Sequence, residues 1–403
     1  MLRSGVLFRS EMPSSTAMIG VVGGGQLARM LVQAANDRAI PVSVQTTSPD
    51  DPAAELAQRL VTADPRDVAG TRQLVEGCSG ITFENEWINI DALMPLEQQG
   101  VLFRPSLASL SPLVDKLSQR QLLDDLAIAS PPWCPLSQIS PAQPALPQGW
   151  AFPVMAKAAR GGYDGKGTRV IASIEGLAQL LRTVEVNDWL LEAWVPYERE
   201  LALVCSRDRQ GRVRSFPLVE THQSHQVCDW VLAPAFVDQS VEAQAYNMAA
   251  SLLTKLNYVG VLALELFYGP DGLQVNEIAP RTHNSGHFSI EACNSSQFDQ
   301  QLCIAADLAV PSPELIHAGA LMVNLLGVAS DQAAPLEQRL DALSQLPETH
   351  LHWYGKTPES PGRKLGHVTV LLKGDTAAAR HREAQEALGI IRGIWPLPRQ
   401  ELD

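Results

Sequence analysis

The sequence predicts a mixed α/β and α+β protein made of three units. Residues 18–84 alternate apolar runs with amphipathic stretches, a pattern typical of a doubly wound sheet. A second alternation of strands and helices occupies residues 152–278, and strand-like segments at 320–325 and 367–372 indicate a small β-rich unit. These observations place the units at 18–114, 115–312 and 313–403, after an N-terminal extension of residues 1–17.

The first unit opens with an apolar strand at 18–22 and a turn of three glycines. Residues 26–36 place Leu27, Met30 and Leu31 on one face, as expected for a helix. The expected alternation continues with a strand at 41–44, a helical stretch at 53–60 and a strand at 80–84.

The second unit begins with a charged amphipathic helix at 115–126, followed by a proline-rich connection at 131–147. Alternating patterns then predict strands at 152–157 and 168–171, a helix at 174–183, strands at 189–195 and 200–206, a helix at 240–256 and a hairpin at 259–278.

The composition excludes several classes of protein. The chain has 403 residues, of which 45% are hydrophobic and 19% charged, and it lacks the apolar run of about 20 residues that a bilayer requires. A net charge of −13 argues against broad binding to nucleic acid or to an acidic membrane. Six scattered cysteines without a C-x-x-C pair indicate a reducing cytoplasm. Residues 1–17 make a poor secretory signal, although their arginines and serines leave an organelle-transit segment as an alternative.

The first glycine turn, Gly23-x-Gly25-x-x-Ala28, matches a dinucleotide fingerprint between a strand and a helix. The second strand nevertheless ends in Val44-Gln45-Thr46-Thr47, without the acidic residue that holds a ribose hydroxyl. We therefore favour a phosphate-bearing ligand other than a dinucleotide. A nicotinamide cofactor and a turn needed only for packing are the alternatives.

A second glycine loop joins two predicted strands over residues 157–168. It is not a P-loop, because Lys166 precedes another glycine and a strand rather than a helix. Its glycines leave backbone N–H groups free to face phosphate oxygens, and Lys157 adds a positive charge. The loop predicts a mobile flap near 160–168 over a triphosphate, with a plain surface hairpin as the alternative.

Two glutamates frame the predicted hairpin around Pro270-Asp271-Gly272. A three-residue loop centred on Asp271 sets Glu265 directly opposite Glu277, whereas a four-residue loop sets Glu265 against Asn276. Either register gathers oxygen ligands suited to Mg²⁺. The alternative is that one carboxylate is protonated or that both reach solvent.

Two further segments concentrate polar groups. Residues 279–287 hold Arg281, two histidines, an amide and a hydroxyl, which suits a small planar anion better than zinc because no H-E-x-x-H pattern is present. Residues 352–367 gather cations in an acidic chain, which suits the phosphate of a second substrate. A solvated loop is the alternative for the second segment.

These motifs resemble the ATP-grasp superfamily and, within it, the N5-carboxyaminoimidazole ribonucleotide synthetase family. The resemblance covers nearly everything from Met18 onward. It is carried by Gly24-Gly25-Gln26-Leu27, Gly161-Gly162-Tyr163-Asp164-Gly165-Lys166-Gly167, Asn276-Glu277-x-Ala279-Pro280-Arg281-x-His283-Asn284-Ser285-Gly286-His287 and His352-Trp353-Tyr354-Gly355-Lys356.

The resemblance implies a Rossmann-like first domain, an ATP-grasp domain and a small C-terminal domain. It also implies a carbon–nitrogen ligase that converts ATP, bicarbonate and aminoimidazole ribonucleotide to N5-carboxyaminoimidazole ribonucleotide, ADP and phosphate in purine biosynthesis, through carboxyphosphate. Mg²⁺ is the implied metal, with Mn²⁺ as an alternative. A cytoplasmic homodimer that binds neither nucleic acid nor membrane is expected.

The family's site residues carry over by position. The implied ATP contacts are Arg104, Lys157, Gly162, Tyr163, Asp164, Gly165, Lys166, Gly167, Thr168, Glu192, Ala193, Trp194, Val195, Glu200, Asn276 and Glu277. The implied metal ligands are Glu265 and Glu277. The ribonucleotide is expected to contact Gln26, Tyr163, Asp164, Arg281, His283, Asn284, Ser285, Lys356 and Arg363, and the implied catalytic residues are Arg281, His283 and Asn284.

One departure from the family pattern concerns an ATP-contacting histidine. Relatives often show Glu-Asn-x-His where this chain reads Glu220-Thr221-His222-Gln223, so that His222 or His225 is left as a replacement. Two other functions compete with the ligase. A nicotinamide oxidoreductase depends on the first glycine turn, and a catalytically silent scaffold is disfavoured because Lys157, Arg281 and both hairpin glutamates are present.

Overall fold

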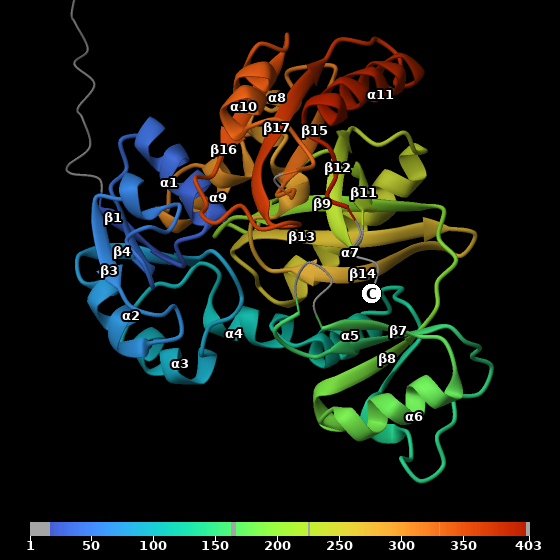
Figure 1. Cartoon of the computed structure of the whole chain (residues 1–403). Coiled ribbons are helices and arrows are strands. Elements are labelled where there is room, and N and C mark those ends of the chain that lie inside the picture. The colour runs from blue at the N-terminus through green and yellow to red at the C-terminus, as the bar shows by residue number, and fades with distance from the viewer. Residues whose placement is uncertain (1–16, 163–166, 225, 330, 400–403) are drawn as a thin grey trace, which may run out of the picture.

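Three sheets organise the chain in the computed structural model, which describes residues 17–162, 167–224, 226–329 and 331–399. Figure 1 shows a parallel sheet with its helices at one side, a long antiparallel sheet through the centre and top, and a small antiparallel sheet below. Tyr163 to Lys166 of the predicted flap, together with His225, lie outside the described residues.

The first sheet is parallel, as the doubly wound pattern predicts. Its strand order is β3-β2-β1-β4. The strands are β1 (Met18–Val22), β2 (Val42–Thr46), β3 (Arg59–Thr62) and β4 (Cys78–Phe83), and the helices are α1 (Gln26–Asp37), α2 (Val68–Val75) and α3 (Ile90–Gln98).

The predicted helical stretch at 53–60 is wrong. Only a short 3-10 turn forms there, η1 (Ala54–Leu56), and the chain then enters β3. Leu60 pairs with Val44 of β2, and the Arg59 guanidinium donates to Ser43 Oγ at 2.8 Å. Pairing with the sheet edge therefore overrides the local helical pattern.

The small sheet has the order β5-β8-β6-β7. Its strands are β5 (Trp133–Pro135), β6 (Val154–Ala158), β7 (Thr168–Ile171) and β8 (Trp189–Ala193), with helix α6 (Ile174–Thr183) packed on it. The short helix α4 (Leu107–Leu110) and helix α5 (Lys116–Asp125) lead into this part of the chain. Asp115 caps α5 by accepting hydrogen bonds from the N–H groups of Leu117 and Ser118.

The central sheet has nine antiparallel strands. They are β9 (Arg199–Arg207), β10 (Val213–Ser215), β11 (Val219–Ser224), β12 (Val227–Ala233), β13 (Gly260–Gly269), β14 (Gly272–Ala279), β15 (Gly319–Leu326), β16 (Thr349–Trp353) and β17 (Lys364–Leu372). Because β12 pairs with β15, the β-rich third unit extends the central sheet rather than forming one of its own. The proposed boundary at 312 thus separates two parts of one continuous sheet.

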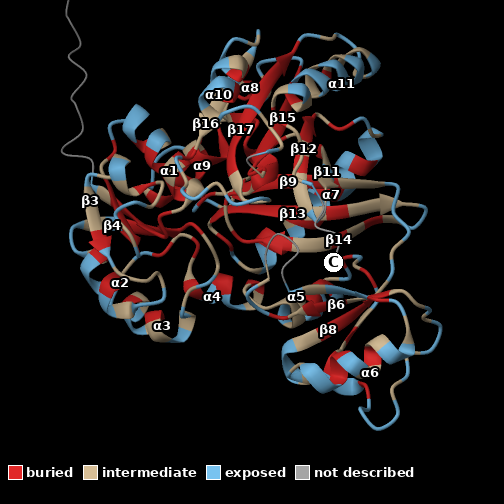
Figure 2. Ribbon diagram, viewed as in Figure 1, coloured by how far each residue is buried: buried red, intermediate tan, exposed pale blue. Residues whose placement is uncertain are grey.

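Helices cover this sheet and join it to the first unit. They are α7 (Gln239–Lys255), α8 (Ser289–Ala292), α9 (Gln297–Ala305), α10 (Leu336–Ser344) and α11 (Ala377–Ile394). One apolar core runs from Val22 and Phe83 of the first sheet to Leu203 and Leu262 of the central one. Figure 2 shows the buried residues concentrated along the strands of both sheets. This shared core fixes the first unit against the central sheet.

Two expectations from composition can be checked on the fold. None of the described helices is long and apolar enough to cross a membrane. All six cysteines are free thiols in the structure.

Candidate active site

The two hairpin glutamates lie directly opposite each other. Glu265 of β13 pairs in register with Glu277 of β14, as predicted. The predicted three-residue loop is wrong, because Gly269 pairs with Gly272 across a two-residue turn. A bulge then shifts the register between Leu266 and Glu265, so Asn276 is skipped and the glutamates meet.

Each glutamate has a cationic or imidazole partner from another element. Glu277 Oε1 lies 2.6 Å from Lys116 Nζ of α5, and Glu265 Oε1 lies 3.1 Å from His283 Nε2. Burial alone raises the pKa of Glu265, but the hydrogen bond from His283 and the positive charges of Lys116 and Lys364 help to outweigh it, so that this pKa is lowered to about 2. Glu265 is therefore ionised at neutral pH.

The glutamate pair suits a hard divalent ion. The side chains of Glu265 and Glu277 remain 33% and 35% exposed, so their oxygens can be reached by a ligand. No group of three or more His, Cys, Asp or Glu side chains within the described ranges could hold a metal alone. Two carboxylates with phosphate oxygens and water are nevertheless the ligand set that Mg²⁺ commonly takes.

A buried ion network lies beside the hairpin. Glu192 of β8 is 2.6 Å from Arg120 of α5 and 2.7 Å from Lys157 of β6. Lys157 Nζ also donates to Asn276 Oδ1 at 2.9 Å, and Arg120 donates to the carbonyls of Val275 and Asn276. The predicted ATP residues Lys157 and Glu192 of the small sheet thus contact Asn276 of the hairpin through this network. The Glu192 carboxylate itself is paired with two cations.

Charges decide the ionisation of this network. Burial lowers the pKa of Lys157, although the neighbouring Glu192 opposes that shift. Burial acts to raise the pKa of Glu192, but Arg120 and Lys157 together lower it. The carboxylate therefore stays charged in the interior.

The described ends of the flap are anchored to the same region. Lys157 pairs with Thr168, and the N–H of Ala158 donates to the carbonyl of Gly167 at 2.7 Å. Gly161 and Gly167 have φ values of 74° and 78°, which favour glycine. The first flap residues thus start from the strand that carries Lys157.

The polar string after the hairpin brings Arg281 to an acid of the first unit. Arg281 Nε lies 2.7 Å from Glu86 Oε2, and both side chains are largely buried. Burial acts to raise the pKa of Glu86, but Arg281 lowers it. This ion pair connects the predicted substrate strip with the loop that follows β4.

His283 is oriented by hydrogen bonds on both ring nitrogens. The N–H of Ser285 donates to Nδ1 at 3.3 Å, so Nε2 is the nitrogen that donates to Glu265. Gln297 holds the backbone of His283, accepting from its N–H at 2.8 Å and donating to its carbonyl at 2.6 Å. A Cβ on Gly286 would lie 2.7 Å from the Gln297 side chain, which explains the glycine. Asn284 exchanges two hydrogen bonds with Asn324 and is buried by that pairing.

The first glycine turn holds a carboxylate of the protein itself. Glu84 accepts hydrogen bonds from the N–H groups of Gly25, at 2.7 Å, and Leu27, at 3.2 Å. A Cβ on Gly23 would lie 2.7 Å from Glu84, and one on Gly24 would overlap Thr46. Because an acid occupies the N-terminus of α1, the phosphate-bearing ligand favoured for this turn and the dinucleotide alternative both lose their phosphate site there.

The C-terminal basic patch reaches the first unit through Tyr354, which packs into the core of that unit, and through Lys356. Lys356 Nζ donates to the side-chain oxygen of Gln26 and, at 3.0 Å, to the carbonyl of Lys364. Arg363 donates to the carbonyls of Thr357 and Pro358. The structure thus brings together Gln26 and Lys356, while the described hydrogen bonds of the Arg363 side chain stay within its own loop.

The remaining predicted ATP residues are less closely grouped. Glu200 of β9 accepts from the Tyr197 hydroxyl at 2.7 Å, and burial raises its pKa although hydrogen bonds from Tyr197 and Gln223 oppose the shift. Gln223, which stands where the family sequence pattern has a histidine, hydrogen-bonds to Glu200, whereas His222 stacks on Trp230. Trp194 is half exposed in the segment after β8, and Arg104 donates to the carbonyl of Phe103.

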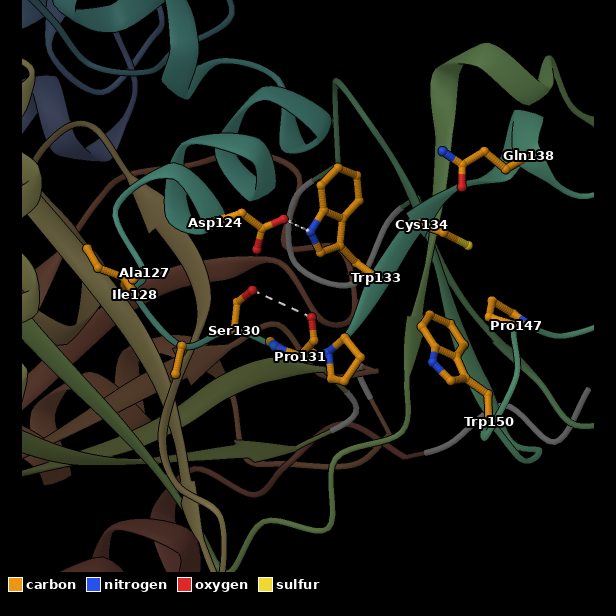
Figure 3. A pocket seen from close by; sticks show the side chains of 12 residues that line it. Asp124, Ala127, Ile128, Ser130, Pro131, Trp133, Cys134, Gln138, Pro147 and Trp150 are labelled. Carbon is orange, nitrogen blue, oxygen red and sulfur yellow. Dashed lines mark hydrogen bonds between the residues drawn. The ribbon is translucent and has the colours of Figure 1, made fainter.

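A described surface cavity lies away from these residues. Figure 3 shows this open surface hollow of about 700 Å³, where the chain leaves α5 and enters β5. Asp124 accepts a hydrogen bond from the Trp133 indole at 2.9 Å in its wall. None of the predicted site residues lines it, so this cavity is not part of the candidate site.

Comparison with known proteins gives three matching family models. They are the ribonucleotide synthetase preATP-grasp domain over residues 16–111, the ATP-grasp domain over 121–298 and the phosphoribosylaminoimidazole carboxylase C-terminal domain over 320–382. The N5-carboxyaminoimidazole ribonucleotide synthase of Synechococcus elongatus is 45% identical over 94% of this chain and 96% of its own length. The chain belongs to this family.

Other members agree with that placement. The Synechocystis synthase is 42% identical over 95% of this chain and 99% of its own. The Aspergillus clavatus synthase, solved in complex with ATP, has a TM-score of 0.84 at 30% identity and covers 94% of this chain and 99% of its own. A second Aspergillus clavatus structure, with ADP and aminoimidazole ribonucleotide, has a TM-score of 0.84 at 29% identity, with the same shares covered. The predicted family, three-part fold class and ATP-grasp ligase assignment are confirmed.

Several members of the site were missed by sequence reasoning. Lys116, Arg120, Glu86, Glu84 and Gln297 reach it from distant elements. For Glu84 and Glu86 a signal was present, since both follow a parallel strand at its carboxyl end, where ligands of such sheets commonly bind. The others lie on helices without a local motif.

Proposed function

We propose that this chain carboxylates aminoimidazole ribonucleotide with bicarbonate at the expense of ATP, giving N5-carboxyaminoimidazole ribonucleotide, ADP and phosphate. The observation that carries the proposal is the meeting of Glu265, Glu277 and Lys157 with the Arg281 and His283 strip in a chain of this family. The relatives solved with ATP, and with ADP and aminoimidazole ribonucleotide, support both substrates.

The reaction first makes bicarbonate reactive. Transfer of the γ-phosphoryl group from ATP to a bicarbonate oxygen gives carboxyphosphate and ADP, which replaces a poor hydroxide leaving group with phosphate. The substrate amine then attacks the carbon, or the CO₂ released from it, and loses a proton while the C–O bond to phosphate breaks. Because water destroys carboxyphosphate, closure of the flap near 160–168 would protect it.

Residues of the chain bind and orient in this scheme. Lys157, held between Glu192 and Asn276, places its charge beside the ATP phosphates. Arg281 and His283 orient bicarbonate and the reacting amine and stabilise developing negative charge, with Asn284 and Ser285 fixing their segment. Gln26, Lys356 and Arg363 receive the phosphate of the ribonucleotide.

Glu265 and Glu277 would hold Mg²⁺. The ion would neutralise phosphate charge and polarise the transferring group. His283 and Lys116 lie against the two carboxylates, at 3.1 Å from Glu265 and 2.6 Å from Glu277. The proposal also includes assembly as a homodimer and a location in the reducing cytoplasm. The six free thiols support the location.

The test is incorporation of labelled bicarbonate into an acid-labile carbamate, followed together with ADP release. We expect both products in equal amounts, only when ATP, Mg²⁺, bicarbonate and aminoimidazole ribonucleotide are all present. ADP release that is indifferent to the ribonucleotide would contradict the proposal. Reduced nicotinamide should give no binding signal, because Glu84 fills the phosphate position of the first glycine turn.

A further inference from the structure

Three polar residues line up across the C-terminal strands. Asn324 of β15 pairs in register with His367 of β17, and His367 pairs with His352 of β16. Asn324 and His367 are fully buried, and the rings of His367 and His352 stack with centroids 4.4 Å apart. We refer to Asn324, His367 and His352 as the polar row.

Each member of the polar row contacts the segment that carries the substrate strip. Asn324 exchanges hydrogen bonds of 2.9 and 2.8 Å with Asn284. The His367 ring lies 4.8 Å from that of His287, and His352 Nε2 lies 2.6 Å from Glu291 Oε1. The row thus holds this segment at three successive points after Arg281.

The same row also contacts the loop that carries Lys356. The hydroxyl of Tyr354 and Nδ1 of His367 share a hydrogen bond of 2.7 Å. Lys356, two residues further on, reaches Gln26 of the first unit. His367 therefore joins two segments that the proposed function places around one substrate, the strip at 281–285 and the loop at 354–356.

Packing alone gives no reason for this polarity. Nε2 of His287 and Nε2 of His367 are buried and have no hydrogen-bond partner among the described residues. Burial lowers the pKa of both imidazoles well below the usual value. At His287 the neighbouring groups that add to this effect are His283, Lys364, His352 and Arg281. At His367 they are His352 and His287. Apolar side chains would fill the same space without leaving such groups unpaired. The buried polar side chains of this region are therefore better explained by the directional hydrogen bonds that they make than by a contribution to the stability of the fold.

We propose that the polar row is a positioning element for the ribonucleotide, with His367 as its central positioning residue. It sets the loop of Lys356 against the strip of Arg281 and His283, and it makes no contribution to the ATP cleft. This inference rests on the proposed function and goes beyond it, because no member of the row needs to touch substrate.

The test is a double-mutant cycle on the hydrogen bond between Tyr354 and His367. Tyr354→Phe and His367→Phe should each raise the KM for aminoimidazole ribonucleotide about tenfold, the value of one hydrogen bond, while the KM for ATP changes less than twofold. The double variant should be no worse than the more severe single variant, since both remove the same bond. His367→Gln, which keeps polar atoms at this position, should recover part of the loss.

Thr369→Val is the matched control. Thr369 lies two residues from His367 on β17, is buried, and its hydroxyl has no described hydrogen-bond partner, so both KM values should stay unchanged. Three results would overturn the inference. The single variants could raise both KM values equally, they could leave both KM values unchanged, or their effects could multiply in the double variant. Failure of the unmodified protein to release ADP in response to the ribonucleotide would instead overturn the proposed function, and this inference with it.

Discussion

The two glycine-rich segments of this protein have similar compositions and different surroundings. In the first, glycines 23–25 lie so close to Glu84 and Thr46 that an added Cβ would collide with them. In the second, a Cβ on Gly161 would meet no atom within 4 Å. The first segment packs tightly against Glu84 at the N-terminus of α1. The described ends of the second segment continue from β6, which carries Lys157, and from its partner strand β7.

This difference teaches that a glycine motif identifies a phosphate site only together with the charge that faces it. Backbone N–H groups attract any anion, and in the first turn the anion is the Glu84 carboxylate. Beside the second loop the facing charge is Lys157, whose positive sign attracts phosphate. The predictions below test that contrast.

The largest effect is expected at the base of the second loop. Lys157→Met removes the cation that contacts Glu192 and Asn276, so ATP-dependent turnover should fall at least about 100-fold. Stability should fall by about 3 kcal/mol, because a buried carboxylate keeps only Arg120 as its partner. Turnover and urea unfolding measure both effects. Lys255→Met on exposed α7 is the matched control, and equal behaviour of the two variants would contradict the assignment.

The next effect separates the two glycine segments directly. Gly25→Ala forces a Cβ onto Glu84 and should lower the free energy of unfolding by about 1–3 kcal/mol. Gly161→Ala meets no neighbour and should cost only the strain of its positive φ, about 1 kcal/mol. Thermal unfolding of both variants provides the comparison. The contrast fails if Gly161→Ala is the more damaging substitution.

The smallest effect concerns the acid in the first turn. Glu84→Gln keeps a hydrogen-bond acceptor at the N-terminus of α1 and should change the free energy of unfolding by no more than about 1 kcal/mol. Its pH dependence is more informative. Burial raises the pKa of Glu84 in the folded protein, so its contribution to stability is fully present below the unfolded pKa and is lost as pH rises through the folded pKa.

Glu265 should behave in the opposite sense. Its folded pKa of about 2 is below the ordinary value of 4.5, so the stability that it contributes is present above pH 4.5 and is lost as pH falls toward 2. Urea unfolding between pH 3 and 8 should therefore show Glu265→Gln less stable than the unmodified protein above pH 4.5, with the difference shrinking toward pH 3. Glu84→Gln should instead gain stability relative to the unmodified protein as pH rises. The same sign for both variants would rule out this electrostatic account.

The sequence predicted local elements better than connections between them. Helix α6 was predicted with its observed bounds, because its apolar period and Ser173 cap are local. Strand β3 was not predicted, and the helical stretch predicted at 53–60 overlaps its first two residues, because the conformation of this strand is fixed by β2. The pairing of Glu265 with Glu277 was predicted correctly, but through a loop length that the bulge at Asn276 replaces.

The partners of the predicted site residues were largely beyond sequence reasoning. Lys116, Glu86 and Gln297 act on residues between 14 and 195 positions away, and one sequence carries no periodicity that reports such contacts. The joining of the C-terminal strands to the central sheet was missed for the same reason. Resemblance to a family supplied the residues, and the fold supplied what orients them.

The central claim, that Glu265 and Glu277 share one divalent ion on the nucleotide, is tested most directly by electron paramagnetic resonance of Mn²⁺ with ADP. The unmodified protein should bind the Mn²⁺–nucleotide complex tightly, and Glu265→Gln and Glu277→Gln should each weaken it at least about tenfold while folding is preserved. Gly25→Ala, in the first unit, should leave this signal unchanged in the folded protein. Undiminished Mn²⁺ binding by both glutamine variants would contradict the account.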